Sequence, residues 1–422
     1  MNFETFGLSP KVAAGVVAEG YVTPTPIQAE AISPVMAGKD VMGLAQTGTG
    51  KTAAFALPIL DRLMTGKRGQ VRALIVAPTR ELAEQTHEAF QALGRKTGIR
   101  SASIYGGVSI HAQKQKLKRG VEILIACPGR LLDHLGQGTA DLSHLEVLVL
   151  DEADQMFDMG FFPDIRRIIR QVPKKRQTLL FSATMPTEIR HLAREVLHDP
   201  ITVQVGMTRP AETVRHALYP VSAHLKTPLL MELLRGTDTR SVLVFTRTKH
   251  RAKRLGHQLE NAGYRAASIQ GNLSQSKRQA ALNGFKDGTY QVLVATDIAA
   301  RGIDVARVSH VINYDVPTTP EAYIHRIGRT GRATHTGDAF TLITEDDHRI
   351  VSAIDRVLDS PAERRTLDDF DYAVPAPPSR SGAPFRPPRS GGRPSSGGRR
   401  TYIPSRSPRL QAKRRDLNGR VV

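Results

Sequence analysis

The sequence predicts an α/β protein built from two tandem copies of one domain and followed by a disordered basic tail. Short apolar runs of strand length alternate with stretches of helical periodicity, which is typical of parallel sheets covered by helices on both faces. Two parts of the chain repeat the same order of motifs. The last 50 residues are rich in Pro, Gly, Ser and Arg and lack apolar periodicity.

The length and composition indicate a large intracellular protein. At roughly 150 residues per domain, 422 residues suggest two or three domains, each able to bury its own core. The single thiol, Cys127, cannot form an internal disulfide. The first eleven residues carry neither a basic nor an apolar leader region, and no apolar run reaches about 18 residues. We therefore expect a soluble, cytoplasmic protein.

Seven apolar runs are the predicted sheet strands, and some of them recur in a second copy. They are residues 73–77, 123–126, 147–150, 178–181, 241–245, 292–295 and 310–313. The run A-L-I-V-A-P-T-R and a later strand ending S-I-Y-G-G are matched by S-V-L-V-F-T-R and S-I-Q-G-N. The join lies near residues 206–214, where T-R-P interrupts the pattern. Because open parallel sheets bind ligands at the carboxyl ends of their strands, two such copies predict a cleft between them.

A phosphate-binding loop follows the first strand of copy one. The sequence A-Q-T-G-T-G-K-T at residues 45–52 precedes a helix predicted over residues 53–63. Gly48 and Gly50 allow backbone N–H groups to wrap a phosphate chain, Lys51 reaches the β- and γ-phosphates, and Thr52 binds Mg²⁺. Ala45 replaces the first glycine of the general pattern. The order strand, loop, helix predicts a nucleoside triphosphate site.

An acidic motif supplies the other half of a hydrolytic site. Residues 147–150 lead into D-E-A-D, in which Asp151 is expected to hold the metal and Glu152 to act as general base for the attacking water. Acidic residues at a helix start are also common because they interact favourably with the helix dipole. The apolar strand and the preceding P-loop favour the catalytic interpretation.

Copy two has no P-loop, which predicts one composite site. It offers H-R-I-G-R-T-G-R at residues 325–332, where Arg329 and Arg332 lie three residues apart. Guanidinium groups supplied from the second copy would stabilise the charge that builds on the γ-phosphate. A basic cluster is often a solvated face, but the interleaved glycines favour an arginine finger.

Taken together, these motifs resemble those of the DEAD-box RNA helicases over about residues 3–358. The further motifs are Phe3 with G-Y-V-T-P-T-P-I-Q (20–28), P-T-R-E-L (78–82), Gly106-Gly107, C-P-G-R (127–130), S-A-T (182–184), V-F-T-R (244–247), Gln275 with Arg278, and A-T-D-I-A-A-R-G-I-D (295–304). The tracts R-L-L-D-H-L at 130–135 and F-D-M-G-F at 157–161, with the short basic tail, are most similar to the bacterial RhlE group. Two departures are Cys127, where the family usually has Thr, and Gln155, where a basic residue is common.

The resemblance implies roles for individual residues. Those implied to bind ATP are Phe3, Tyr21, Gln28, Ala45, Gln46, Thr47, Gly48, Thr49, Gly50, Lys51, Thr52 and Asp304. Those implied to bind RNA, largely without sequence preference, are Arg80, Gly107, Arg130, Arg247, Arg278 and Thr296. Those implied to couple hydrolysis to unwinding are Asp154, Ser182, Ala183, Thr184 and His325.

The same resemblance implies a domain plan. It comprises a Q-motif segment (1–33), a RecA-like ATP-binding domain (34–206), a linker (207–216), a second RecA-like domain (217–358) and a disordered tail (359–422). The predicted function is that of an ATP- and Mg²⁺-dependent RNA helicase acting on single strands and short duplexes, with ribosomal or RNA-decay proteins as candidate partners and no membrane. An RNA-binding clamp or remodeller and a DNA-directed motor are the alternatives.

The charge of the chain is unevenly distributed. The formal net charge is +19, yet residues 373–422 alone hold 12 Lys and Arg against one acidic residue. Composition alone allows either a solvated appendage or a polyanion-binding arm. Beside a predicted RNA-dependent enzyme, we expect the tail to tether RNA.

Overall fold

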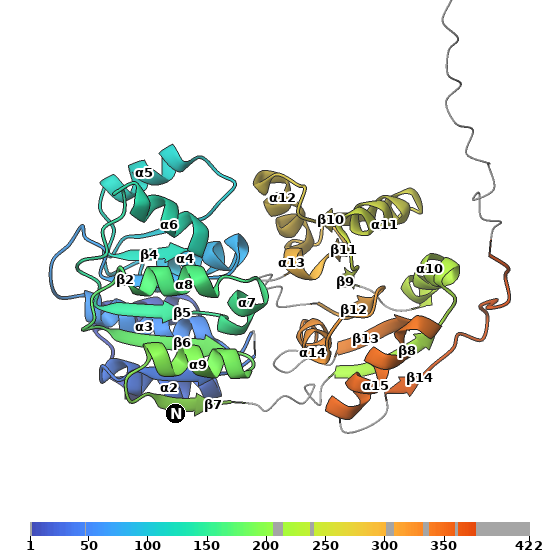
Figure 1. Ribbon diagram of the computed structural model, residues 1–422, viewed down its shortest axis with the longest axis horizontal. Coiled ribbons are helices and arrows are strands. Elements are labelled where there is room, and N and C mark those ends of the chain that lie inside the picture. The colour runs from blue at the N-terminus through green and yellow to red at the C-terminus, as the bar shows by residue number, and fades with distance from the viewer. Residues whose placement is uncertain are drawn as a thin grey trace, which may run out of the picture. The chain divides into compact units, whose positions relative to one another are not determined.

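The computed structural model describes residues 2–46, 48–205, 214–236, 240–300, 308–331, 337–358 and 362–376 (Figure 1). Two seven-stranded sheets organise these residues. We call residues 2–205 the first lobe and residues 214–376 the second lobe, in each case as far as they are described. Along the described chain, no helix is both long and apolar enough to cross a membrane.

The first sheet is parallel throughout, in the strand order β3-β4-β2-β5-β6-β1-β7. Its strands are β1 (Val41–Leu44), β2 (Ala73–Val76), β3 (Ser101–Ile104), β4 (Ile123–Ala126), β5 (Val147–Leu150), β6 (Gln177–Ser182) and β7 (Ile201–Gln204). The helical elements are η1 (Phe3–Phe6), α1 (Pro10–Ala18), α2 (Pro26–Met36), α3 (Lys51–Leu63), α4 (Arg80–Leu93), α5 (Ile110–Lys118), α6 (Pro128–Gly136), α7 (Ala153–Asp158), α8 (Phe162–Ile169) and α9 (Thr187–Val196).

The second sheet is also parallel and has the order β10-β11-β9-β12-β13-β8-β14. Its strands are β8 (Val214–Pro220), β9 (Val242–Phe245), β10 (Ala266–Ile269), β11 (Val292–Ala295), β12 (His310–Asn313), β13 (Gly337–Ile343) and β14 (Glu363–Arg364). The helical elements are η2 (Ala223–Leu225), α10 (Lys226–Gly236), α11 (Lys249–Asn261), α12 (Gln275–Lys286), α13 (Asp297–Ala300), α14 (Pro320–Ile327), η3 (Glu345–Asp347) and α15 (His348–Val357). Adding seven to each strand number of the first sheet gives the strand order of the second, so β8 corresponds to β1 and β14 to β7. The predicted tandem α/β duplication is therefore confirmed.

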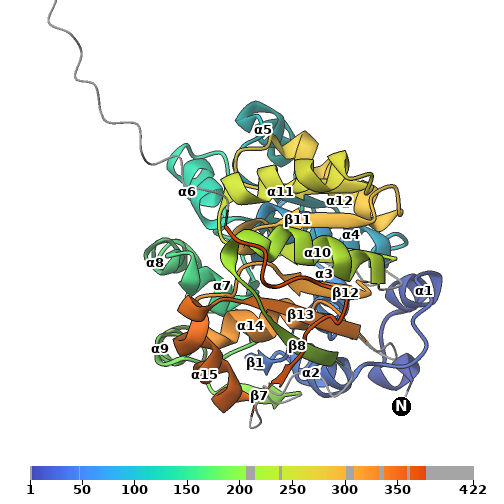
Figure 2. The same ribbon diagram turned by 90° about the vertical axis from the view of Figure 1, so that its right-hand side faces the viewer.

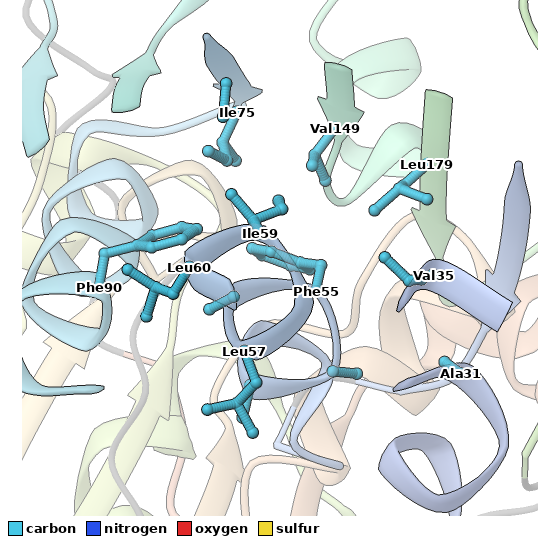
Figure 3. Packing of buried hydrophobic residues seen from close by; sticks show 14 of the residues in the cluster. Ala31, Val35, Phe55, Leu57, Ile59, Leu60, Ile75, Phe90, Val149 and Leu179 are labelled. Carbon is cyan, nitrogen blue, oxygen red and sulfur yellow. The ribbon is translucent and has the colours of Figure 1, made fainter. Parts of the chain in front are cut away.

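Helices cover both faces of each sheet, which is why the strands are apolar without alternation. In the first lobe, Phe55, Ile59 and Phe90 pack from α3 and α4 against Ile75 and other strand residues on one face (Figure 3). Helices α6 to α9 cover the opposite face. In the second lobe, α10 and α11 pack on one face, in front of the sheet in Figure 2, and the hydrophobic clusters place α12 to α15 on the other.

The structure corrects three of the predicted boundaries. Residues 1–33 do not form a separate segment, because Phe3, Phe6 and Val16 pack in the core of the first lobe and α2 crosses residue 33. Strand β8 begins at Val214, inside the predicted linker 207–216, because it pairs along its length with β13. The helix after the P-loop begins at Lys51 rather than at residue 53.

The packed chain also extends beyond residue 358, where the tail was expected to begin. Glu363 and Arg364 form β14, which pairs with β8. Leu367, Phe370 and Tyr372 then pack against the α10 and α11 side of the second sheet. We call residues 362–376 the strap. The remainder of the predicted tail, residues 377–422, lies outside the described residues.

Candidate functional site

The P-loop joins β1 to α3 and is shaped by two glycines. Gly48 and Gly50 have φ angles of +85° and +93°, in the left-handed region where a side chain is disfavoured. The ammonium group of Lys51, at the start of α3, is buried and donates a hydrogen bond to the Ala45 carbonyl at 2.9 Å. The loop is tied further by the Thr49 hydroxyl, which donates to the Gln46 carbonyl at 2.7 Å. A buried lysine beside the N-terminus of a helix is suited to binding the phosphates of a nucleotide.

The N-terminal segment packs directly against this loop. Gln28 is buried, and its Nε2 donates to the Gly50 carbonyl at 3.1 Å, while its Oε1 accepts from the Thr25 N–H at 3.0 Å. Phe3 lies 6.0 Å from Tyr21 between ring centroids. Phe3, Tyr21 and Gln28, three of the residues implied to bind ATP, therefore lie in segments that pack together in the first lobe. Without the family resemblance, only the capping pattern of Thr25 and Gln28 would have marked this segment.

Asp151 and Glu152 follow β5 and are both buried. Burial raises the pKa of Asp151 to about 6, and the positive charge of Lys51 opposes that shift. Glu152 has a φ of +51°, one of two non-glycine residues with positive φ among those described. Such strain is retained where a side chain must be held in a specific place. Asp151 and the Thr52 hydroxyl are hard oxygen donors, and a nearby cation would favour the charged form of the buried carboxylate, so they fit Mg²⁺.

Asp154 holds the S-A-T segment through a network of hydrogen bonds. Its Oδ2 accepts from the Ala183 N–H at 3.1 Å, the Thr184 N–H at 3.0 Å and the Thr184 hydroxyl at 3.1 Å. The Ser182 hydroxyl accepts from the Asp154 N–H at 3.2 Å and donates to the Thr184 carbonyl at 2.7 Å. From the second lobe, His325 Nε2 lies 4.0 Å from Asp154 Oδ2. The structure therefore brings all five predicted coupling residues together.

Arg329 lies just after α14 and is buried. It lines a cavity of about 410 Å³ together with Asp154, Thr184, His325 and Arg326. The neighbouring Gly328 approaches the P-loop, because a Cβ placed there would lie 3.8 Å from Gln46 Oε1. The predicted arginine finger is therefore close to the ATP-site motifs. The second predicted finger, Arg332, lies outside the described residues, as do Thr47 and Asp304.

In the first lobe, three predicted RNA-binding residues gather beyond the carboxyl ends of β2, β3 and β4. Arg80 begins α4, and its guanidinium packs over Gly107, where a Cβ would lie only 2.1 Å from Arg80 Nη1. Gly107 also has a φ of +80°, so glycine is required there on two grounds. Arg130 Nη1 donates to the Val108 carbonyl and to Gln113 Oε1, both at 3.2 Å.

In the second lobe, the predicted RNA-binding residues lie at the corresponding strand ends. The Arg247 side chain is half exposed, and Thr296 directly follows β11. Arg278 on α12 instead contacts the first lobe, where its Nη2 lies 2.8 Å from Glu81 Oε1. Gln275 accepts a hydrogen bond from Arg80 Nη1 at 3.3 Å. Arg80 and Arg278 thus already have protein partners, and their contacts with RNA stay predictions.

Comparison with known proteins decides the family. A model of the DEAD/DEAH box helicases matches residues 25–192, and a model of the helicase conserved C-terminal domain matches residues 225–334. The chain belongs to the DEAD-box helicases. It is an ATP-dependent RNA helicase, which uses ATP hydrolysis to remodel RNA.

Individual relatives agree with this assignment over most of the chain. The DEAD-box ATP-dependent RNA helicase CshA of Geobacillus kaustophilus is 44% identical over 376 residues, covering 88% of this chain and 80% of the relative. The ATP-dependent RNA helicase DeaD of Buchnera aphidicola is 41% identical, covering 88% and 62%. The structure of S. cerevisiae Dbp5 bound to RNA and ADP BeF3 is 31% identical with a TM-score of 0.79, covering 87% and 96%.

In this helicase, sequence reasoning missed two residues that organise the site. Arg326 is buried and pairs with Asp297 through Nε at 2.6 Å and Nη2 at 2.7 Å, while its guanidinium carbon lies 4.9 Å from the Phe245 ring centroid. Gln113 is buried and accepts from Arg130, so it orients that guanidinium. Arg326 stands inside the recognised H-R-I-G-R tract, but nothing in the sequence marks Gln113.

Cys127, which stands where the family usually has Thr, is buried. Cys127 precedes α6, and burial raises the pKa of its thiol to about 12. The side chain is therefore a neutral thiol, which donates only a weak hydrogen bond. Backbone N–H groups at the start of α6 can still face a phosphate. The other departure, Gln155, is buried in α7 beside Asp154.

Proposed function

We propose that this helicase hydrolyses ATP in the first lobe and uses hydrolysis to control how tightly its two lobes hold single-stranded RNA. In this scheme Lys51 binds the β- and γ-phosphates, while Thr52 and Asp151 hold Mg²⁺. The ion, when bound, neutralises charge on those phosphates. Glu152 orients and deprotonates the attacking water, and the guanidinium groups of Arg329 and Arg332 stabilise the charge that develops on the γ-phosphate. The proximity of these motifs supports the proposal.

The adenine and ribose ends of the nucleotide are assigned to three residues. Gln28 would exchange its hydrogen bond to the Gly50 carbonyl for one to the adenine edge, and Phe3 would pack on the adenine face. Asp304 would contact the ribose from the second lobe. This arrangement selects ATP over GTP, because the amide of Gln28 complements the donor and acceptor pattern of adenine.

RNA is held by its backbone in our proposal. Arg80, Gly107 and Arg130 in the first lobe, with Arg247, Arg278 and Thr296 in the second, would contact phosphates and 2′-OH groups. Such contacts carry little sequence information, so many single strands would bind. Bending of the held strand would prevent it from pairing, and a short duplex would come apart.

The observation that carries this function is the contact between Asp154, the S-A-T segment and His325. It joins the residues of hydrolysis in the first lobe to α14 of the second lobe through a hydrogen-bonded network and a close His–Asp approach. ATP and RNA that favour the same arrangement of the lobes would each raise the affinity for the other.

The test is the RNA dependence of ATP turnover in the wild type and in Lys51→Ala. We expect RNA to stimulate the wild type and the substitution to lower kcat by about 10²-fold or more, because the phosphates lose a buried cation. ATP turnover that RNA does not change, or that stays at the wild-type level in Lys51→Ala, would refute the proposal.

A clamp or remodeller that holds RNA with little strand separation uses the same motifs. A strand-displacement assay on a short duplex, run beside an RNA-retention assay, separates the two activities. Displacement at ATP-dependent rates supports the helicase cycle, whereas retention without displacement supports the clamp.

The finer assignments rest on sequence. We propose membership of the RhlE group on the tracts at residues 130–135 and 157–161, a cytoplasmic location, and ribosomal or RNA-decay proteins as partners. We also propose that the Arg-rich residues beyond the strap tether RNA, because that stretch contains 12 basic residues and only one acidic residue.

A further inference from the structure

Asp315 in the second lobe is the counterpart of Asp151 in the first by its backbone hydrogen bond, although Tyr314 stands between Asp315 and the end of β12. It follows β12, which takes the place of β5 in the strand order. The Asp151 N–H donates to the carbonyl of Val76, the last residue of β2, at 3.0 Å. The Asp315 N–H donates to the carbonyl of Phe245, the last residue of β9, at 3.2 Å. The same backbone hydrogen bond therefore places both aspartates at the same edge of equivalent sheets.

The two aspartates have different partners. Asp151 faces Lys51 of the P-loop, whereas the second copy has no P-loop. Asp315 is buried, and its Oδ2 accepts from the backbone N–H of Arg247 at 2.8 Å. Its Oδ1 accepts from the guanidinium of Arg251 at 2.5 Å. Partners of this kind compensate the cost of burying a carboxylate, so the charge of Asp315 is tied to the chain segment that carries Arg247.

The backbone carbonyl of Asp315 reaches a third arginine. It accepts from Arg326 Nη1 at 2.6 Å. Arg326 lies on α14, and its own carbonyl accepts from the Arg329 N–H at 3.1 Å. Asp315 thus contacts both the loop that carries Arg247 and the helix that positions Arg329.

We infer that Asp315 is a positioning residue that couples RNA contact at Arg247 to the placement of Arg329. The inference rests on the proposed function, in which Arg247 contacts RNA and Arg329 acts on the γ-phosphate. RNA bound by Arg247 restrains the loop that the Asp315 carboxylate holds, and the Asp315 carbonyl transmits that restraint to Arg326. Asp151 thus acts at the nucleotide, whereas Asp315 acts in communication between the RNA and ATP sites.

The experiment measures ATP turnover against RNA concentration for Asp315→Asn. The substitution keeps the size of the side chain but turns an amide NH₂ towards one of the two donors. We expect the RNA concentration for half-maximal stimulation to rise about tenfold, because a charge-assisted hydrogen bond is replaced by a donor–donor contact. The ratio of RNA-stimulated to basal turnover should fall as well.

A matched control is Asp338→Asn. Asp338 forms an exposed ion pair with Arg215 at 3.1 Å in the same lobe and lies outside the proposed machinery. Both its half-maximal RNA concentration and its stimulation ratio should stay within about twofold of the wild type, as expected for a surface pair.

A second variant keeps the inference testable should Asp315→Asn unfold. Arg251→Met removes one donor to the carboxylate and should raise the half-maximal RNA concentration about threefold, since one of two hydrogen bonds is lost. Lys253→Met removes the same charge from an exposed position of α11 and should change that concentration less.

The possible outcomes are distinct. An unchanged half-maximal RNA concentration in Asp315→Asn, or a proportional fall of basal and stimulated turnover, would overturn the inference. Equal effects of Arg251→Met and Lys253→Met would overturn it too, because the effect would then be one of general charge. A wild type that RNA does not stimulate would instead refute the proposed function.

Discussion

At the residue scale, the backbone of Glu152 is the clearest sign of function in the first lobe. Its left-handed conformation costs a non-glycine residue free energy, and its carboxylate is held buried next to Asp151. The conformation is understandable if the carboxylate must point at a water molecule beside the γ-phosphate.

We predict that Glu152→Gln lowers ATP turnover by about 10²-fold or more while ATP still binds, because the amide has the same size but cannot take the proton. Binding of a fluorescent ATP analogue and steady-state turnover measure the two effects. Glu152→Gly should also lose turnover. Its free energy of unfolding should nevertheless rise by about 1 kcal/mol, since glycine relieves the backbone strain. Normal turnover in either variant would contradict the assigned base.

His325 gives a prediction about pH. Burial lowers the pKa of His325, and the nearby Asp154 carboxylate only partly opposes this. The folded protein therefore holds His325 neutral, whereas the unfolded chain protonates it near pH 6.5. The stabilising contribution is present above that pH and is lost as the pH falls below it.

The free energy of unfolding should accordingly fall more between pH 7.5 and pH 5.5 in the wild type than in His325→Asn. Denaturant titrations at the two pH values provide the measurement. The same pH dependence in both proteins would show that His325 is not held neutral by the fold.

At the scale of elements, the strands could be predicted because burial on both faces leaves continuous apolar runs. All seven predicted runs coincide with strands of the two sheets to within a residue or two at their ends. Strand β14 could not be predicted in this way, because it consists of Glu363 and Arg364. It is a strand only because the edge of β8 is available to pair with it.

The residues of the site, like the strands, could be predicted only where the signal is local in sequence. The P-loop and D-E-A-D could be predicted because their order beside a strand and a helix is local in sequence. The role of Gln113 could not, because its partners Arg130 and His134 are 17 and 21 residues away. Phe3 and Gln28 were found through the family resemblance, since a surface aromatic and a helix-capping amide have common structural explanations.

The strap gives the prediction that belongs to this scale. Truncation after residue 358 removes β14 and the packing of Phe370 against Tyr372, whose ring centroids lie 4.8 Å apart. The free energy of unfolding should fall by about 3 kcal/mol, because several partly buried apolar side chains and the strand pairing are lost. Chemical denaturation measures the change. Truncation after residue 376 is the control, and equal stability of the two proteins would contradict the packing role of the strap.

At the scale of the whole molecule, the net charge of +19 has two parts. Residues 1–372 hold 47 basic and 39 acidic residues, so this part of the chain is only mildly basic and its functional arginines are distinguished by position. The remaining net charge of +11 lies entirely beyond the strap, where 12 Lys and Arg stand against one Asp.

Removal of residues 377–422 should weaken RNA binding several-fold at low salt and flatten its salt dependence, because fewer counterions are released from the RNA. Basal ATP turnover should not change. RNA-binding titrations at several salt concentrations test this, and an unchanged slope of affinity against salt would make the basic residues a solvated appendage.

The central claim is that RNA held by both lobes controls ATP hydrolysis in the first. Its most direct test is the ATP turnover of the full chain with RNA, with DNA of the same sequence and with neither. We predict strong stimulation by RNA and little by DNA, because the proposed contacts include 2′-OH groups. Turnover that is indifferent to nucleic acid, or equal with RNA and DNA, would contradict the account.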